Sequence, residues 1–247
     1  MKGYMKYHII TLFPEMFDSY LNESILGRAI KNKKISVSFT NPRKFVSGKY
    51  KKVWPDGNVS LQIDERPYGG GPGMVMMAEP VIKAVLSITK KISKDKKTRK
   101  VLIINFMPNA KKFDTKKAKG ISKKYTDIIM ICGRYEGIDS RVNKVIKKEG
   151  YKIENISVGD YVLTGGEIPA MILVDSISRQ IEGVLGNFNS REEERVSSSE
   201  IYTRPEVLVW PPSHKATASQ SKKYKVPKVL LSGNHKDIDS WKSKNKK

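Results

Sequence analysis

The chain is short of cysteine, histidine and long apolar runs, and each shortage excludes a class of protein. Its 247 residues contain one cysteine, Cys132, so no disulfide can form within the chain and no thiolate cluster can hold zinc. The three histidines, His8, His214 and His235, have no metal-ligand spacing to one another. No apolar stretch approaches the roughly 20 residues that span a bilayer, and the start of the chain lacks the features of a signal peptide. We therefore expect a soluble, cytoplasmic protein with no membrane partner.

Acidic residues are also scarce relative to basic ones. The chain carries 47 Lys+Arg against 25 Asp+Glu, a formal net charge of +22. Such a surface favours a polyanionic partner, and RNA, DNA and an anionic membrane all fit on charge alone. A lysine-rich genome that makes many of its proteins basic is the other interpretation. Hydrophobic residues make up 38%, which is enough for a core, and the length suits one large domain or two smaller ones.

Short apolar runs alternate with helical patterns over about the first 185 residues. This alternation predicts an α/β fold with a parallel sheet and helices on both faces. Residues 43–78 are rich in loops, 90–100 form a solvated basic connection, and 210–225 resemble a flexible insert. The expected strands cover 7–13, 35–40, 101–107, 127–132 and 156–163; the expected helices begin at Pro14, near Ile25, at Glu79, after Asp114, at Arg141 and at Pro169.

Two glycine-punctuated blocks carry the strongest functional signal. Cys132–Gly137 and Val158–Pro169 each combine glycine with a tyrosine and a carboxylate, next to a short apolar run. Glycine lets the backbone take positive φ and lets a ligand approach closely. Loops at the carboxyl ends of central strands are where open α/β sheets bind ligands. The two blocks therefore predict a small-molecule pocket, with a solvated turn as the other interpretation of residues 133–137.

A third glycine-rich block, Arg66–Met74, is neither a Walker loop nor a dinucleotide fingerprint. No Gly-Lys-Ser/Thr follows it, and Met74 stands where the third glycine of the fingerprint is required. It is either a structural turn or a backbone surface that accepts a nucleotide closely. In the second case Arg66 and Tyr68 would contact phosphate and stack on a base.

Charged residues near the end of this region have two interpretations each. Arg179 lies on the apolar helix that follows Pro169, where it is either the solvated edge or part of a site. The run Glu192–Glu194 is either solvated or a source of a general base. Arg204, in the turn 202–206, either meets phosphate or pairs with Glu206. No Ser-His-Asp or Cys-His order stands out, and Cys132 ends an apolar strand, where burial is expected.

Six blocks, taken in order, resemble the bacterial tRNA (guanine-N1)-methyltransferases of the TrmD family. The resemblance covers nearly the whole chain, and the ordered set is far more specific than any one block. The blocks are Leu12–Phe17, Arg66–Met74, Cys132–Asp139, Gly159–Glu167, Tyr202–Glu206 and Leu231–His235.

The resemblance implies a SPOUT-type α/β fold whose C-terminal part is threaded into a deep trefoil knot, followed by a small helical C-terminal domain. It divides the chain into a methyltransferase domain at 1–186, a linker at 187–200 and a basic tRNA-binding region at 201–247, which is shorter than is usual in the family. It also implies an obligate homodimer that binds S-adenosylmethionine and methylates N1 of guanosine 37, beside the tRNA anticodon. Magnesium is implied as well, although no ligand set can be read from the sequence.

Site residues follow from the resemblance and from the motifs. The expected cofactor loops are Met107–Asn109, 133–137 and 158–169. Their cofactor-binding residues are Met107, Pro108, Asn109, Gly133, Tyr135, Glu136, Gly137, Val158, Gly159, Tyr161, Leu163, Gly165, Gly166 and Pro169; the expected RNA-binding residues are Arg66, Tyr68, Gly69, Gly70, Tyr202 and Arg204.

The chemistry requires a base and a positive charge, because guanine N1 carries a proton at neutral pH. A carboxylate can remove it, and an arginine can stabilise the charge that develops on O6. Arg179 matches the family's arginine through its context. Where the family has an aspartate as base, counting without a gap reaches Glu194, whose extra methylene shifts the carboxylate; Glu193 or Glu192 serves if the alignment slips. A catalytically impaired RNA-binding homologue, or a methyltransferase of the same fold acting on another RNA, are the rival hypotheses.

Overall fold

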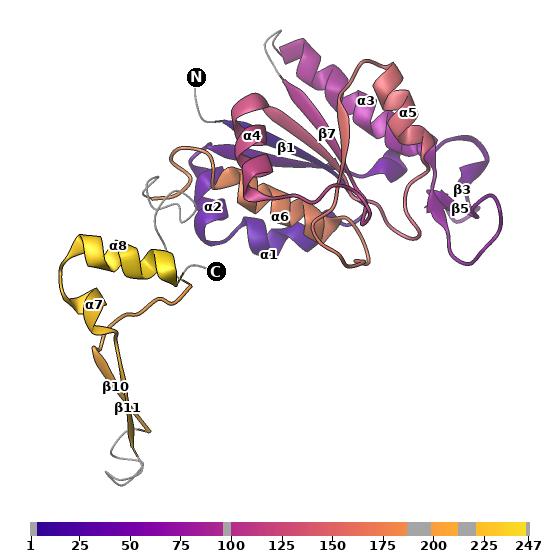
Figure 1. Ribbon diagram of the computed structural model, residues 1–247. Coiled ribbons are helices and arrows are strands. Elements are labelled where there is room, and N and C mark those ends of the chain that lie inside the picture. Colours follow the sequence, from indigo (N-terminus) through magenta and orange to yellow (C-terminus); the bar gives the residue numbers. More distant parts are fainter. Residues whose placement is uncertain (1–3, 96–99, 187–198, 212–220, 246–247) are drawn as a thin grey trace. The chain divides into compact units, whose positions relative to one another are not determined.

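A computed structural model describes residues 4–95, 100–186, 199–211 and 221–245. The chain divides into two compact units, Met1–Phe188 and Asn189–Lys247, and each is described by itself. The first unit contains a five-stranded sheet in the order β2-β1-β8-β7-β9 (Figure 1). Every strand pair in this sheet is parallel, which confirms the predicted α/β architecture. The strands are β1 (Met5–Ile10), β2 (Ile35–Thr40), β7 (Val101–Phe106), β8 (Asp127–Ile131) and β9 (Ile153–Ile156).

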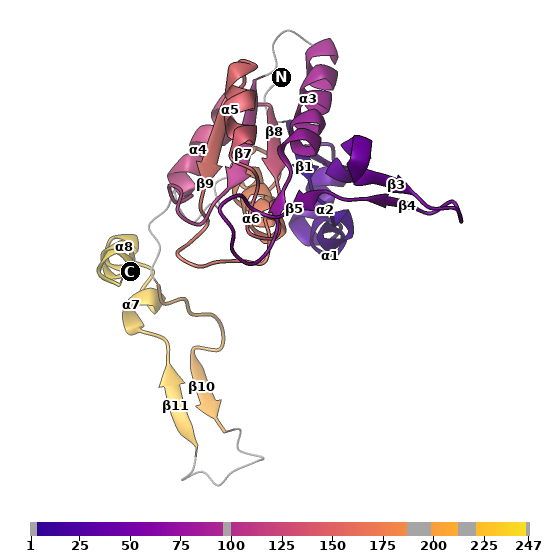
Figure 2. The ribbon, with the colours of Figure 1, turned by 90° about the vertical axis from the view of Figure 1, so that its right-hand side faces the viewer.

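Helices cover both faces of the sheet (Figures 1 and 2). One core cluster packs the short helices α1 and α2, together with α4 and α6, on one face, and the other cluster packs α3 and α5 on the opposite face. A 3-10 turn, η1 (Pro14–Phe17), leads into α1 and places Pro14 in its first turn. The helices are α1 (Asp18–Leu21), α2 (Ser24–Lys31), α3 (Ala78–Asp95), α4 (Thr115–Lys124), α5 (Arg141–Lys148) and α6 (Glu167–Ser178).

The direction of chain travel across the sheet reverses at β8. From β7 the chain moves to β8 through α4, and from β8 it passes back across β7 to reach β9 through α5. The two connecting helices lie on opposite faces of the sheet. Because the direction of travel reverses and the connecting helix changes to the other face, the two crossovers have the same handedness. The twist of parallel sheets favours one hand for such crossovers.

Among the sequence-based boundaries, those of α3 and β9 were wrong. Helix α3 continues to Asp95, where a solvated connection was expected from residue 90, because Ile88 and Ile92 extend the buried stripe of Val81 and Val85. The expected strand 156–163 is instead β9 at 153–156, because β9 pairs with β7 and its partner strand ends at Phe106. Residues 157–166 then form a loop.

Residues 43–78 contain more regular structure than the expected loops. A 3-10 turn at Gly48–Tyr50 leads into a hairpin of two antiparallel strands, β3 (Lys51–Val53) and β4 (Val59–Leu61). A second antiparallel pair, β5 (Asp64–Glu65) and β6 (Val75–Met76), encloses the glycine-rich block. Backbone bonds join this region to the sheet: Met76 N donates to Gly137 O at 3.0 Å.

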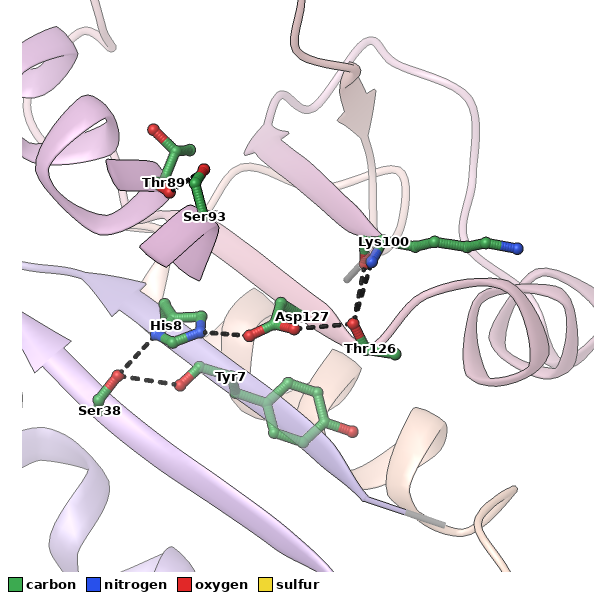
Figure 3. A network of polar contacts seen from close by, with 8 residues as sticks. All are labelled: Tyr7, His8, Ser38, Thr89, Ser93, Lys100, Thr126 and Asp127. Atoms are coloured by element: carbon green, nitrogen blue, oxygen red, sulfur yellow. Dashed lines mark hydrogen bonds and ion pairs between the residues drawn. The ribbon is translucent and has the colours of Figure 1, made fainter. Parts of the chain in front are cut away.

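A polar network with one buried carboxylate connects three strands of the sheet (Figure 3). His8 Nε2 lies 3.1 Å from Oδ1 of the fully buried Asp127, and His8 Nδ1 lies 2.9 Å from Ser38 Oγ. Thr126 donates to the second carboxylate oxygen at 2.8 Å. Side chains of β1, β2 and β8 are thereby joined by hydrogen bonds outside the cavity.

The second unit contains an antiparallel hairpin and two helices. Strand β10 (Val207–Trp210) pairs with β11 (Lys222–Lys225), followed by α7 (Lys228–Leu231) and α8 (His235–Lys244). Tyr202 packs against Trp241 with ring centroids 6.3 Å apart. The sequence-based insert at 210–225 therefore ends in a strand, while the part between the strands lies outside the described residues.

Candidate active site

A cavity of about 530 Å³ lies at the carboxyl ends of β7, β8 and β9. Its volume is within the range typical of small-molecule sites. Three stretches of chain line most of it, at 105–108, 133–138 and 155–166, with Pro169 at the start of α6. The cavity thus occupies the edge of a parallel sheet at which ligands bind in open α/β folds.

The structure brings nearly all the expected cofactor-binding residues together at this cavity. Each of them except Asn109 lines it. Asn109 instead belongs to the turn that follows, in which Ala110 N donates to Met107 O at 3.1 Å. The lining establishes that the three loops meet, and the binding role of each residue stays a prediction.

The loop after β8 turns sharply at the cavity. Tyr135 has a φ of 59°, which is uncommon for a residue with a side chain, and Gly137 has a φ of 122°. Gly137 N closes the turn on Arg134 O at 3.1 Å, and Glu136 N donates to Met74 O at 2.9 Å. The turn therefore presents the tyrosine and glutamate side chains while its backbone is fixed by the neighbouring glycine-rich block.

Gly166 marks the closest approach of the two cofactor loops. Its N–H donates to Gly133 O at 2.9 Å. A Cβ added at Gly166 would lie 2.6 Å from the Cα of Cys132, so no other residue fits without moving the backbone of β8. The loop from β9 is thus pressed against the end of β8, and glycine is required by space at this position rather than by φ.

A buried carboxylate connects three of the sequence motifs. Glu167, at the first turn of α6, is 1% exposed and accepts a 2.8 Å hydrogen bond from Thr11 Oγ1. Its other oxygen, Oε2, lies 3.1 Å from Arg134 Nε. The Arg134 guanidinium also lies over the ring of Phe13, 4.6 Å from the centroid. The end of β1, the loop after β8 and the start of α6 are therefore held by one charged cluster beside the cavity.

Three asparagines on the α5 side of the cavity were not identified from the sequence. Asn105 and Asn155 are direct partners in the register of β7 and β9, and Asn143 Nδ2 donates to Asn155 Oδ1 at 2.9 Å. Asn105 is 7% exposed and its Oδ1 has no hydrogen-bond partner within the described chain. A buried oxygen of this kind is costly unless a ligand or water satisfies it. The available signal was one amide within the otherwise apolar strand 101–106.

The expected RNA-contacting loop of the first unit lies at the rim of the cavity. Gly69, Gly70, Gly71 and Gly73 all have positive φ, and Tyr68 is 98% exposed. A Cβ added at Gly73 would lie 2.6 Å from Cγ of Glu136. The block is therefore a left-handed glycine turn packed against a cavity residue, with the exposed Arg66 and Tyr68 at its start.

The remaining expected residues are not gathered at this cavity. Arg179 follows the last residue of α6, and the cavity touches the first turn of that helix. Tyr202 and Arg204 belong to the second unit. Glu192, Glu193 and Glu194 lie outside the described residues.

The Cys132 thiol does not take part in the site as a nucleophile. It is buried at the end of β8. Burial raises the pKa of the Cys132 thiol well above its usual value, and the nearby Glu167 raises it further. A thiol held neutral in this way is a poor nucleophile, which agrees with the expectation of burial.

Neither a metal-binding cluster nor a membrane-spanning helix is present in the part of the chain that the structure describes. Within the described ranges, no group of three or more His, Cys, Asp or Glu side chains is placed to hold a metal ion. Of the helices that the structure describes, none is both long and apolar enough to cross a membrane.

The fold and the cavity define an α/β protein with a cavity of small-molecule size, lined by glycine-rich loops at the carboxyl ends of a parallel sheet. Comparison with known proteins narrows this class. The sequence model described as "tRNA (Guanine-1)-methyltransferase TrmD" matches residues 5–247. The chain belongs to this family of tRNA (guanine-N1)-methyltransferases.

Individual relatives agree with the family assignment. A protein from Carboxydothermus hydrogenoformans named tRNA (guanine-N(1)-)-methyltransferase is 42% identical over 240 residues, which cover 97% of this chain and 82% of the relative. Proteins of the same name from Clostridioides difficile and Photobacterium profundum are 42% and 41% identical, and the matches cover 90% and 83% of their lengths.

Proposed function

We propose that this protein transfers a methyl group from S-adenosylmethionine to N1 of guanosine 37 in tRNA. The observation that carries the proposal is the cavity at the ends of β7, β8 and β9, which is built from the three loops expected to hold the cofactor. Family membership supports the enzyme class and the kind of RNA. The impaired-homologue and other-RNA hypotheses gain no support from the names of the relatives.

The cavity suits the proposed cofactor chemically. S-adenosylmethionine supplies an activated methyl group, and its adenine and ribose offer hydrogen-bond donors. The Oδ1 atoms of Asn105 and Asn143 have no hydrogen-bond partner among the described residues and are acceptors at the cavity. Tyr135 and Tyr161 provide aromatic surface, and the backbone near Gly166 allows close approach. These residues would bind and orient the cofactor. Tyr135 and Glu136 lie on the side of the cavity next to the glycine-rich block Arg66–Met74.

The reaction also needs a general base and a stabilising positive charge, and the residues proposed for these roles are not among the described residues that line the cavity. The proton on guanine N1 must go to a carboxylate, and we assign it to Glu194, with Glu193 or Glu192 as alternatives. Arg179 would stabilise negative charge on O6. Arg179 follows Pro169 by ten positions along and just beyond α6, which is roughly 15 Å at the helical rise. Its role is therefore easiest to explain if it serves the cavity of a second copy.

An exposed apolar surface supports a homodimer. Phe13, directly before η1, Met16 on η1 and Tyr20 on α1 are exposed. Ile168 and Ile172 on α6 are exposed as well. They belong to neighbouring elements, because α6 contacts η1 and the Tyr20 hydroxyl donates to Asp175. Contiguous apolar patches on a soluble surface mark interaction sites. A second copy covering this surface would also bring its own α6 towards the first.

The path of the chain after β9 supports the proposed trefoil knot. The chain crosses from β8 past β7 to β9, and residues 157–166 then return to the end of β8, where Gly166 bonds to Gly133. On this path, residues 157–166 pass the loop at 133–138 that follows β8. We propose that this passage is the threading that the resemblance implies, with the cofactor held between the two loops.

The second unit is proposed to bind tRNA in the cytoplasm. Its described strands and helices carry many lysines, including Lys222, Lys223 and Lys225 on β11. Phosphate contacts from such residues supply affinity without reading sequence. Magnesium remains an expectation of the family with no ligand set among the described residues.

The decisive experiment mixes the protein with labelled S-adenosylmethionine and tRNA transcripts that carry guanosine at positions 36 and 37. We expect N1-methylguanosine at position 37, and its absence would refute the proposal. Single Glu192→Gln, Glu193→Gln and Glu194→Gln variants then assign the base. The variant of the true base should lose activity by at least about a hundredfold. Full activity in all three would place the base elsewhere.

A further inference from the structure

The β3–β4 hairpin presents an aromatic and basic surface that the proposed chemistry does not use. It projects from the body of the first unit (Figure 2). Every residue from Lys51 to Ser60 is exposed, so neither face of the hairpin is packed on a core at its tip. Trp54 is 54% exposed, and Val53 and Val59 beside it are also exposed. Large apolar side chains left in water at the tip of a short hairpin indicate a surface that a partner covers.

The hairpin register separates its side chains into two groups. Lys52 pairs with Ser60, and Trp54 N donates to Asn58 O at 2.9 Å. Because side chains alternate across a strand, Lys52 and Trp54 lie on the same face, about 7 Å apart. Leu61 is half-buried, as is Tyr50 at the hairpin base, and both pack against a core cluster. Core contact is therefore confined to the base of the hairpin, and beyond it the face that carries Lys52 and Trp54 is exposed, as is the opposite face.

Charge identifies the chemistry of the partner. Between residues 43 and 62 the only acidic side chain is Asp56, and both of its carboxylate oxygens accept hydrogen bonds from Asn58. The basic side chains over the same stretch are Arg43, Lys44, Lys49, Lys51 and Lys52. A tryptophan among lysines combines a stacking surface for a base with cations for phosphates, which is the pattern of single-stranded nucleic-acid contacts. A protein partner would not require this excess of lysine.

The hairpin base is connected to the candidate active site by backbone hydrogen bonds. Gln62 N donates to Tyr50 O at 3.0 Å and closes the base of the hairpin. Met77 N then donates to Ile63 O at 2.8 Å, and the adjacent Met76 N donates to Gly137 O in the cavity loop. The hairpin is therefore the neighbouring surface for a long ligand that extends from the rim of the cavity along these hydrogen-bonded segments.

We propose that the β3–β4 hairpin binds an unpaired segment of the RNA substrate, with Trp54 stacking on a base and Lys51 and Lys52 contacting phosphates. This inference rests on the proposed function only in taking the RNA to be the substrate of the same enzyme. The hairpin contributes to the affinity for RNA, and the cavity alone binds the cofactor.

Three variants of the full chain test the inference. Trp54→Ala removes the stacking surface, Trp54→Phe retains an aromatic ring, and Lys51→Ala/Lys52→Ala removes two cations. The matched control is Lys147→Ala/Lys148→Ala, which removes the same charge from the exposed last turn of α5. That turn leads into β9 and therefore lies on the amino side of the sheet, away from the cavity at the carboxyl ends.

The readouts are the dissociation constant for a tRNA transcript over a range of salt, and the separate KM values for tRNA and S-adenosylmethionine. We expect Trp54→Ala to weaken RNA binding about tenfold and Trp54→Phe to restore most of it. The double lysine variant should lower the slope of log affinity against log salt by about 1.4. The KM for S-adenosylmethionine and the melting temperature should stay unchanged.

Two results would overturn the inference. One is RNA affinity of Trp54→Ala and of the double lysine variant within twofold of the α5 control. The other is a change of oligomeric state in the Trp54→Ala protein, which would make the hairpin an interface between copies. Direct RNA binding does not depend on turnover, so these outcomes are separate from failure of the methylation assay.

Discussion

Arg134 Nε lies 3.1 Å from Glu167 Oε2, and this contact joins the loop after β8 to the first turn of α6. Neither atom has an aligned hydrogen bond within the described chain, so charge rather than hydrogen-bond geometry holds the pair. Glu167 is buried and its other oxygen is bonded to Thr11. The pair therefore fixes α6 to the loop after β8 at the point where the cavity begins.

Replacing Glu167 should destabilise the protein more than removing its hydrogen-bond donor. Glu167→Gln leaves Arg134 facing a neutral group in a mostly buried position, and we expect a loss of about 3 kcal/mol in the free energy of unfolding. Thr11→Val should cost only about 1 kcal/mol. Urea denaturation followed by circular dichroism measures both. Equal losses would mean that the charge of Glu167 contributes nothing beyond its hydrogen bond.

A methyl group at Gly166 should damage the site. Its Cβ would lie 2.6 Å from the Cα of Cys132, so Gly166→Ala must push the loop away from β8. We expect at least a tenfold loss of S-adenosylmethionine affinity in calorimetry, together with a lower melting temperature. Gly120→Ala is the control, because nothing lies within 4 Å of its added Cβ on α4 and alanine favours helices. Undiminished affinity in Gly166→Ala would show that the loop contact is dispensable.

The Cys132 thiol should resist modification in the folded protein. Burial raises its pKa well above the usual range, with Glu167 adding to the effect, and the thiolate is the reactive form. At pH 8 we expect alkylation to be at least a hundredfold slower in native protein than in urea-unfolded protein. Rapid labelling of native protein would mean that the end of β8 opens readily.

Asp139 should stabilise the start of α5 in a pH-dependent way. It accepts from Arg141 N at 2.8 Å, and the Arg141 guanidinium bonded to it lowers the pKa of the Asp139 carboxyl. A lowered folded-state pKa gives stability that is present above the unfolded value of about 3.9 and is lost as pH falls through the folded value. The deficit of Asp139→Ala relative to wild type should therefore be constant near pH 7 and shrink below about pH 4. A deficit that grows in acid would contradict the assignment.

The sequence predicted the sheet and the candidate cofactor loops well, because both depend on local pattern. Apolar strands such as 127–131 are buried on both faces. A glycine soon after such a strand indicates a turn at the end of the strand. Asp114 was expected to cap a helix, and its carboxylate does accept from Lys117 N. These features need no knowledge of distant parts of the chain.

What the sequence did not predict depends on distant contacts or on exposed strands. The Arg134–Glu167 pair joins the loop after β8 to the first turn of α6, and Asn105 meets Asn155 only through the register of β7 and β9. The β3–β4 hairpin was missed because its three-residue strands are exposed on both faces and show no alternation. The end of β9 was misplaced because the partner strand, rather than its own residues, sets its length.

The return of the chain from β9 to β8 also determines when the site can exist. Its walls come from residues 105–108, 133–138 and 155–169, so a chain emerging from the ribosome has no cavity until α6 begins to form. Contacts of such long sequence separation are slow to establish. We therefore expect newly made chains to pass through a stage in which the sheet is paired but the cofactor does not bind. Free cofactor should then favour the final folding step, in which the cavity forms, because it binds only the completed cavity.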